Sequence, residues 1–219
     1  MADWEGPILN LLTRNPGKIR EINRIFSPFS LQVRSVSEIA DPGDVPETGA
    51  SYAENALLKA RRGFEVTGEL CAGEDSGLEI DVLGGAPGLY SARFGGELLT
   101  SHDRNSRILE LLIGVPPEKR TARFVCVVAL AWKGRERLFE GRCEGWITEK
   151  PSGTGGFGYD PIFLLPPYGK TFAKLGESIK NRFSHRAIAF RACAEYLKAV
   201  MSDERTQPLK EDLPGAKEC

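Results

Sequence analysis

The spacing of apolar residues predicts strands and helices that alternate in the first part of the chain. Apolar residues are nearly continuous from Ile8 to Leu12 and alternate with polar residues from Leu31 to Val36, as they do in β-strands. Pro16 suits the first turn of a helix, and apolar residues at helical spacing follow it. The same spacing predicts a second helix over residues 53–64, after a loop at 41–49 that is rich in proline and glycine.

Long strands are predicted in the middle of the chain. Alternation over residues 78–82 predicts a half-buried strand, preceded by a turn at 73–77. The apolar run from Phe124 to Trp132 predicts a long strand, and residues 137–147 supply its antiparallel neighbours. Early helices, long central strands and a closing helix favour a mixed α/β fold. Helical spacing returns at residues 108–112 and 190–201.

Length and composition indicate one globular unit. A chain of 219 residues is long enough for one domain, or two close lobes, with a sizeable core. We expect residues 1–202 to form this single domain. Residues 203–219 carry mixed charge, two prolines and few apolar side chains, so we expect a disordered tail.

Charge, cysteines and hydropathy exclude several classes of protein. A net charge of −1 gives no overall field to attract nucleic acid, so we expect no such partner. Five cysteines without a C-x-x-C spacing favour a reduced protein with no disulfide framework or zinc site. The longest apolar run, at residues 124–132, is too short to span a bilayer, and the acidic N-terminus does not resemble a signal peptide. We therefore expect a cytoplasmic protein without a membrane partner.

The glycine-rich loop at residues 153–158 is the strongest candidate for ligand binding. Its sequence GTGGFG satisfies the dinucleotide pattern G-x-G-x-x-G, which requires a helix immediately afterwards. Pro161 disfavours helical geometry at Asp160, so the chain is expected to continue extended. Bare backbone with Phe157 and Tyr159 beside it suits a flat ring, such as a nucleobase, better than a pyrophosphate.

Residues 13–18, with the sequence TRNPGK, lie where a predicted strand becomes a helix. The free N–H groups of a helix start attract anions, and Gly17 would let a phosphate approach closely. Lys18 is disfavoured by the helix dipole unless an anion is bound there. A solvated lysine after an Asn or Thr cap explains the pattern equally well, so both interpretations stay open.

Two further groups of polar residues could carry chemistry. Glu74 and Asp75, with Glu47 in the earlier loop, offer carboxylates for Mg²⁺, although ordinary turn chemistry explains their spacing better. Ser184 is a natural N-cap for the last helix and places His185 and Arg186 in its first turn. Cations without an acid at a positive helix end violate a local rule, which favours a functional site over a solvated patch.

Taken together, five segments resemble the inosine triphosphate pyrophosphatase family, which removes noncanonical purine nucleoside triphosphates. They cover nearly everything from Ile8 to about Leu197, in the family's order. The resemblance implies a mixed α/β fold of two lobes, with a long central sheet flanked by helices and the active cleft between the lobes. It also implies a homodimer and Mg²⁺-dependent hydrolysis between the α- and β-phosphates. The segments are TRNPGK, ETGASYAENALLKA, EDSGLEIDVLGGAPGLYSARF, GTGGFGYDPIF and SHR.

The resemblance also assigns roles to residues of this chain. Glu47, Asp75 and Glu74 would hold the metal, Asp75 would also accept the proton, and Lys18 would offset charge on the phosphates. Glu74 stands where bacterial members commonly have a second Asp. The phosphates would bind to Thr13, Arg14, Asn15, Pro16, Gly17 and Lys18. The remaining substrate contacts would come from Ser76, from the base pocket of Phe157, Gly158, Tyr159 and Asp160, and from Lys180, His185 and Arg186 over the purine.

Two other functions remain open at this point. The protein could be a nucleotide sensor without turnover, although Glu47 and Asp75 speak against it. It could also be a related pyrophosphatase that acts on modified pyrimidine triphosphates. In either case Phe157 or Tyr159 would offer a stacking face for the base.

Overall fold

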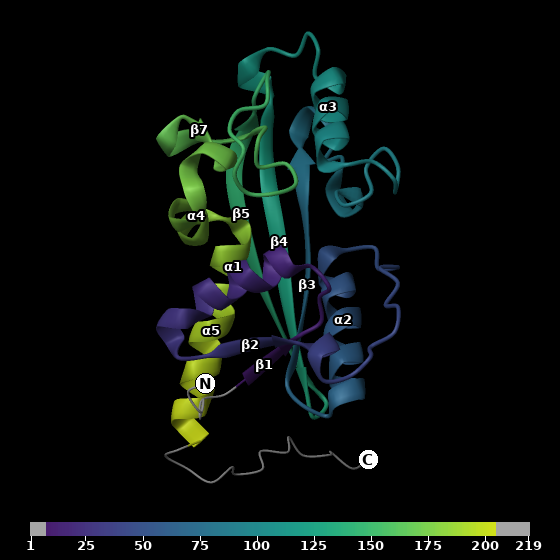
Figure 1. The fold of residues 1–219 in the computed structure, drawn as a ribbon, viewed down its shortest axis with the longest axis vertical. Coiled ribbons are helices and arrows are strands. Elements are labelled where there is room, and N and C mark those ends of the chain that lie inside the picture. Colours follow the sequence, from purple (N-terminus) through teal and green to yellow (C-terminus); the bar gives the residue numbers. More distant parts are fainter. Residues whose placement is uncertain (1–7, 205–219) are drawn as a thin grey trace, which may run out of the picture.

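The computed structural model describes residues 8–204 and contains one seven-stranded mixed sheet with helices packed against it (Figure 1). The strand order is β2-β1-β3-β4-β5-β6-β7. The strands are β1 (Ile8–Leu11), β2 (Gln32–Ser35), β3 (Cys71–Ile80), β4 (Thr121–Trp132), β5 (Arg135–Ile147), β6 (Phe163–Leu165) and β7 (Lys170–Thr171). The helices are α1 (Pro16–Phe26), α2 (Tyr52–Thr67), α3 (Ser101–Leu111), α4 (Phe172–Phe183) and α5 (His185–Glu204).

Three long antiparallel strands, β3, β4 and β5, form the spine of the sheet. β1 lies at one edge of this group, where it pairs parallel with both β2 and β3. At the other edge, β6 pairs antiparallel with β5, and β7 pairs antiparallel with β6. The predicted mixed α/β fold is confirmed. The predicted neighbours over residues 137–147 form one continuous strand, β5.

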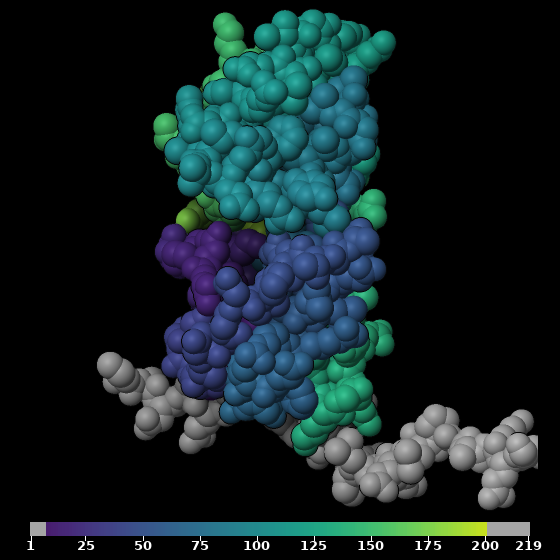
Figure 2. All heavy atoms as spheres, turned by 90° about the vertical axis from the view of Figure 1, so that its right-hand side faces the viewer, coloured from purple at the N-terminus to yellow at the C-terminus, as the bar shows by residue number. Residues whose placement is uncertain are grey.

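The core is divided into three clusters: α2 packs on Val127, Ala129 and Ala131 of β4, and the other two clusters also share the long strands. In one cluster, α1 and α5 pack on the half of β4 that carries Cys126, Val128 and Leu130. In the other, α3, α4 and β6 surround the half that carries Ala122 and Phe124. These clusters give the molecule two lobes, and Figure 2 shows its surface hollowed between the teal lobe and the purple segment of α1.

The turn predicted at residues 73–77 is wrong, because this segment lies inside β3 and pairs with β4 throughout. Glycines that resemble turn residues in the sequence serve here for close packing. A Cβ at Gly73 would overlap the backbone of α2, and one at Gly77 would overlap the Gly88 carbonyl oxygen. The strand also ends earlier than predicted, since Val82 lies in a short 3₁₀ helix and is exposed.

The glycine loop, the end of α5 and the cysteines were also subjects of sequence predictions. Among the described residues no helix begins directly after the glycine loop, as Pro161 predicted. The expected extended continuation is wrong for residues 158–162, which form turns closed by backbone hydrogen bonds from Ile162 and Phe163 to the Tyr159 carbonyl oxygen, and β6 begins only at Phe163. α5 continues to Glu204 and so includes the first two positions of the predicted tail, and the rest of that tail lies outside the described residues. Among residues 8–204 there is no helix long and apolar enough to cross a membrane. The described cysteines are free and buried: Cys71, Cys126, Cys143 and Cys193.

The close approach of β3 to α2 predicts a large stability difference between two glycine substitutions. Gly73→Ala should lower the free energy of unfolding by more than about 2 kcal/mol, because its Cβ overlaps the backbone of α2. Gly84→Ala is the control: Gly84 has φ of 64° but open space around it, so only the backbone cost of about 1 kcal/mol is expected. Urea denaturation measures both, and equal losses would contradict the role of close packing.

Candidate active site

A pocket of about 590 Å³ lies between the two lobes and brings together most of the residues singled out in the sequence. It is lined by the start of α1, the middle of β3, the start of α3, the glycine loop and the junction of α4 with α5. Thr13, Arg14, Glu47, Glu74 and Asp75 do not line it. The predicted site residues that do are Asn15, Pro16, Gly17, Lys18, Ser76, Phe157, Gly158, Tyr159, Asp160, Lys180, His185 and Arg186.

Asn15 is the N-cap of α1. Its Oδ1 accepts hydrogen bonds from the backbone N–H groups of Gly17 (2.9 Å) and Lys18 (3.3 Å). The Thr13 hydroxyl oxygen accepts from the Asn15 N–H, and Arg14 turns away to donate to the Gly43 carbonyl oxygen. Asn15 thus occupies two N–H donors that an anion could otherwise use. An anion that bound here would have to displace the Asn15 side chain or share these donors with it.

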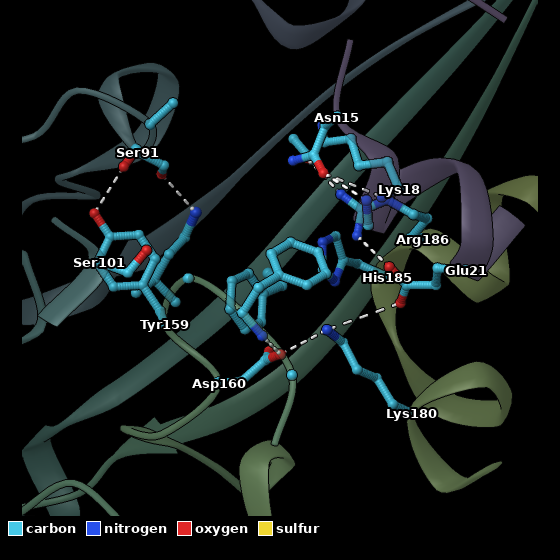
Figure 3. Close-up of a pocket in the computed structure, with 18 of the residues that line it drawn as sticks. Asn15, Lys18, Glu21, Ser91, Ser101, Tyr159, Asp160, Lys180, His185 and Arg186 are labelled. Atoms are coloured by element: carbon cyan, nitrogen blue, oxygen red, sulfur yellow. Dashed lines mark hydrogen bonds and ion pairs between the residues drawn. The ribbon is translucent and has the colours of Figure 1, made fainter. Parts of the chain in front are cut away.

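A buried charge network joins α1, β3 and α5 at the back of the pocket (Figure 3). Arg186 is 2% exposed and donates to Glu74 Oε1 (2.8 Å), Glu21 Oε2 (2.8 Å) and the Ser76 hydroxyl oxygen (3.1 Å). Lys18 Nζ lies 3.0 Å from Glu74 Oε2. Lys18 is therefore paired rather than a solvated cap neighbour, and the basic start of α5 is balanced by acids from two other elements.

Glu21 was missed in the sequence, although a signal for it exists. It lies one turn before Ile25 and next to Ile22, in the stripe of α1 that faces the core. A carboxylate in such a stripe is buried, and a buried charge requires a partner. Here the partner comes from α5, more than 160 positions later in the chain.

The network fixes the protonation of its members. Burial alone would raise the pKa of Glu74, but the charges of Arg186 and Lys18 hold that pKa well below its usual value. Burial, with the positive charge of Arg186, lowers the pKa of His185 well below its usual value, so its ring is neutral. That ring stacks on Phe124 with centroids 4.6 Å apart, and its Nδ1 is buried without a partner among the described residues.

The glycine loop is anchored by a second buried ion pair. Lys180 Nζ lies 2.6 Å from Asp160 Oδ2, which also accepts from the Phe157 N–H (2.8 Å). Tyr159 is buried and donates its hydroxyl proton to the Ser91 carbonyl oxygen, whereas Phe157 is 41% exposed. Lys180 Nζ lies 4.0 Å from the centroid of the Phe157 ring. Of the two rings considered as stacking faces, only that of Phe157 is open in this structure.

The other acidic candidates lie on the opposite face of β3 from Glu74. Asp75 accepts from the Asn55 side chain (2.9 Å) and from the Ser76 N–H (2.9 Å). Lys59 contacts Glu47 and lies 3.9 Å from Asp75 Oδ1, so one ammonium lies between these two carboxylates. Burial raises the pKa of Asp75, with Lys59 and Asn55 opposing that rise.

Lys59 and Asn55 were also missed in the sequence. They lie four residues apart on the face of α2 that meets β3, which is the spacing of neighbours on one side of a helix. Within residues 8–204 no three His, Cys, Asp or Glu side chains come together as a ready metal site. A cation here would have to rely on Glu47 and Asp75.

The open mixed sheet and this pocket define a class of protein: an α/β protein whose cleft between lobes suits an anionic ligand with a flat ring. The chain belongs to the Ham1 family, whose sequence profile matches residues 9–196. The resemblance drawn from the five segments is thereby confirmed.

Known relatives cover nearly the whole chain. A dITP/XTP pyrophosphatase from Desulforamulus reducens is 47% identical over 190 residues, covering 86% of this chain and 94% of that protein. One from Bacillus subtilis is 42% identical over 190 residues, covering 86% and 96%. The solved structure of a HAM1 protein from Coxiella burnetii matches with a TM-score of 0.79 at 34% identity, covering 90% of this chain and all of that one. A nucleoside-triphosphatase, or dITP/XTP pyrophosphatase, from Mycobacterium abscessus matches with a TM-score of 0.69 at 39% identity, covering 87% and 98%.

The charge network predicts a pH-dependent loss of stability in Glu74→Gln. Removing one carboxylate leaves Arg186 and Lys18 partly uncompensated, which should lower the free energy of unfolding by about 3 kcal/mol. The pKa of Glu74 is lower in the folded protein than its usual 4.5, so its stabilisation is fully present above pH 4.5 and is lost as the pH falls towards the folded-state pKa. The difference from the wild type should therefore be constant around neutral pH and shrink in acid.

Urea denaturation at several pH values measures this difference. Glu69→Gln is the control, because Glu69 forms a more exposed ion pair with Arg34 and should contribute less than about 1 kcal/mol. A loss in Glu74→Gln no larger than in Glu69→Gln would contradict the importance of the network.

Proposed function

We propose that the protein hydrolyses the noncanonical purine nucleotides ITP, dITP and XTP to the monophosphate and pyrophosphate. The observation that carries this proposal is the convergence of a basic helix start, an exposed aromatic ring and a buried, ion-paired arginine in one pocket. The names of the relatives, dITP/XTP pyrophosphatase, support the same substrates.

The base would stack on Phe157, with Lys180, His185 and Arg186 around it. Purines of this class carry a 6-keto oxygen where adenine carries an amino group. Arg186 has only donors, so it suits a keto oxygen and leaves an amino group facing another donor. A buried polar mismatch of this kind rejects the wrong base strongly.

The phosphates would lie along the start of α1 and beside Ser76. Lys18 supplies a positive charge there, and the backbone N–H groups of Gly17 and Lys18 would become available to a phosphate if the Asn15 cap yielded or shared them. We propose that Thr13 supports the Asn15 cap and that Arg14 contacts phosphate only if it leaves Gly43. Both residues remain candidates of the proposed phosphate site.

We propose Mg²⁺ as the cofactor, held by Glu47 and Asp75. Two hard carboxylates fit Mg²⁺, which commonly uses one or two carboxylates and completes its shell with water and substrate phosphates. The ammonium of Lys59 shares both carboxylates, which indicates that a cation is favoured at this position. The ion would supply charge neutralisation for the phosphate oxygens.

Glu74 is less suited to that metal. Both of its oxygens are engaged by Arg186 and Lys18, on the other face of the strand. We propose that Glu74 positions these two cations toward base and phosphate.

Asp75 is the proposed proton acceptor for the attacking water. Burial raises its pKa, which makes its carboxylate a stronger base, and Asn55 fixes its orientation. Lys18 offsets negative charge that builds on the phosphate oxygens. The proposal also retains the expected homodimer and cytoplasmic location, with no nucleic-acid or membrane partner; gel filtration tests the dimer.

The first test is incubation with ITP, XTP and ATP in the presence of Mg²⁺. Pyrophosphate should be released from ITP and XTP at rates well above that from ATP. Asp75→Asn should lower kcat by about 10²-fold or more, since it removes a general base. Release of orthophosphate, or equal turnover of ATP, would refute the proposal. Turnover confined to modified pyrimidine triphosphates, or an Asp75→Asn variant that behaves as the wild type, would favour the alternatives.

The pH profile gives a second test. The reaction requires the Asp75 carboxylate, so kcat/KM should rise as the pH rises through a pKa that lies above the usual 3.8. Asn55→Ala removes a hydrogen bond that lowers this pKa, so the acid limb of the profile should move to higher pH. Steady-state kinetics over a pH series measures the shift, and a limb that stays in place or moves to lower pH would exclude Asp75 as the titrating group.

A further inference from the structure

Arg104 is a pocket-lining cation with an unused hydrogen-bond donor. It lies in the first half of α3 and lines the pocket together with Ser101, one turn earlier on the same helix. Its Nε is buried and has no hydrogen-bond partner in the described part of the chain. A buried donor without an acceptor costs free energy, so the missing acceptor is one that a ligand can supply.

The other cations of the pocket are already paired or exposed. Arg20 lies exposed on α1. Among residues 8–204, Arg104 is thus the partly buried cation of this pocket that has no acid to pair with. The paired cations are Lys18 with Glu74, Arg24 with Glu177, Lys180 with Asp160, and Arg186 with Glu21 and Glu74.

Arg104 lies at the end of the pocket where the purine base is proposed to bind. The next residue, Asn105, donates from its side chain to the Gly158 carbonyl oxygen (3.1 Å), which ties α3 to the glycine loop. A capping box between Thr100 and Asp103 fixes the start of the helix. Burial raises the pKa of Tyr159 to about 12, and the positive charge of Arg104 opposes that rise, as expected of close neighbours.

The wall that carries Arg104 lies opposite the charge network. In Figure 3, Ser91, Ser101 and Tyr159 lie on one side of the pocket, and Asn15, Lys18 and Arg186 lie on the other. A purine whose 6-keto oxygen meets Arg186 therefore has room to present another edge to the α3 side. The phosphate-binding candidates, Lys18 and the start of α1, are remote from that side.

The 6-keto purines differ at carbon 2, which carries hydrogen in hypoxanthine, a keto oxygen in xanthine and an amino group in guanine. A guanidinium donor bonds a keto oxygen, gains nothing from hydrogen and leaves an amino group facing another donor. We propose that Arg104 is a specificity-determining residue that donates to the 2-keto oxygen of XTP and discriminates against the 2-amino group of GTP. This inference rests on the proposed function and adds to it a reason for the exclusion of GTP.

The test compares kcat/KM for XTP, ITP and GTP in the wild type and in Arg104→Met, which keeps a long unbranched stem but removes every donor. The ratio of XTP to ITP should fall about tenfold or more, as expected for a lost hydrogen bond to a charged donor. The ratio of GTP to ITP should rise. Arg107→Met is the matched control, because Arg107 lies on the same helix, is exposed and pairs with Glu110 (3.4 Å), so both ratios should stay unchanged.

Unchanged ratios in Arg104→Met, or an equal loss for all three substrates, would overturn the inference, since Arg104 would then contact a part common to all three or only support the fold. Thermal denaturation checks folding, and Arg104→Leu, which also removes every donor, replaces the variant if it does not fold, with the same directions expected. If the wild type releases no pyrophosphate from ITP, the proposed function fails by itself. Binding of XMP, IMP and GMP to wild type and variant then tests Arg104 separately, with loss of preference for XMP over GMP expected.

Discussion

The contact on which the rest of the structure depends is the pairing of Arg186 with Glu74 and Glu21. It joins the start of α5, the middle of β3 and the buried stripe of α1 at the back of the pocket. Charges this deeply buried are stable only when every partner is present. The same guanidinium that holds the elements together therefore faces the pocket with its charge and orientation fixed in advance.

The two sides of the cleft are built differently. On the α1 and α5 side, the buried cations are paired with acids. A ligand there meets hydrogen-bond donors whose orientation is fixed and whose positive charge is already neutralised. On the α3 side, few charges are present, and Arg104 retains an unsatisfied donor. A ligand that contacts both sides would supply the missing hydrogen-bond acceptor on the α3 side and leave the ion pairs of the α1 and α5 side in place.

Much of this could be predicted from local sequence, and the failures share one cause. Pro16, Ser184 and Pro161 act on their own neighbours, so the helix starts, and the lack of a helix directly after the glycine loop, were predictable. Gly73 was misinterpreted because a helix that packs against a strand is invisible in the strand's own sequence. Glu21 and Arg104 were missed for the same reason, since what distinguishes them is a partner, or the lack of one, from distant segments.

Glu74 and Asp75 are consecutive in β3, and their side chains leave the strand on opposite faces. One peptide unit thus separates the carboxylate that pairs with Arg186 and Lys18 from the one that we propose as the proton acceptor. Because side chains alternate along a strand, inserting or deleting a single residue ahead of this pair would exchange the faces of β3 on which the two carboxylates lie. The strand therefore keeps the two carboxylates apart, and its register, as well as its composition, must be preserved during evolution.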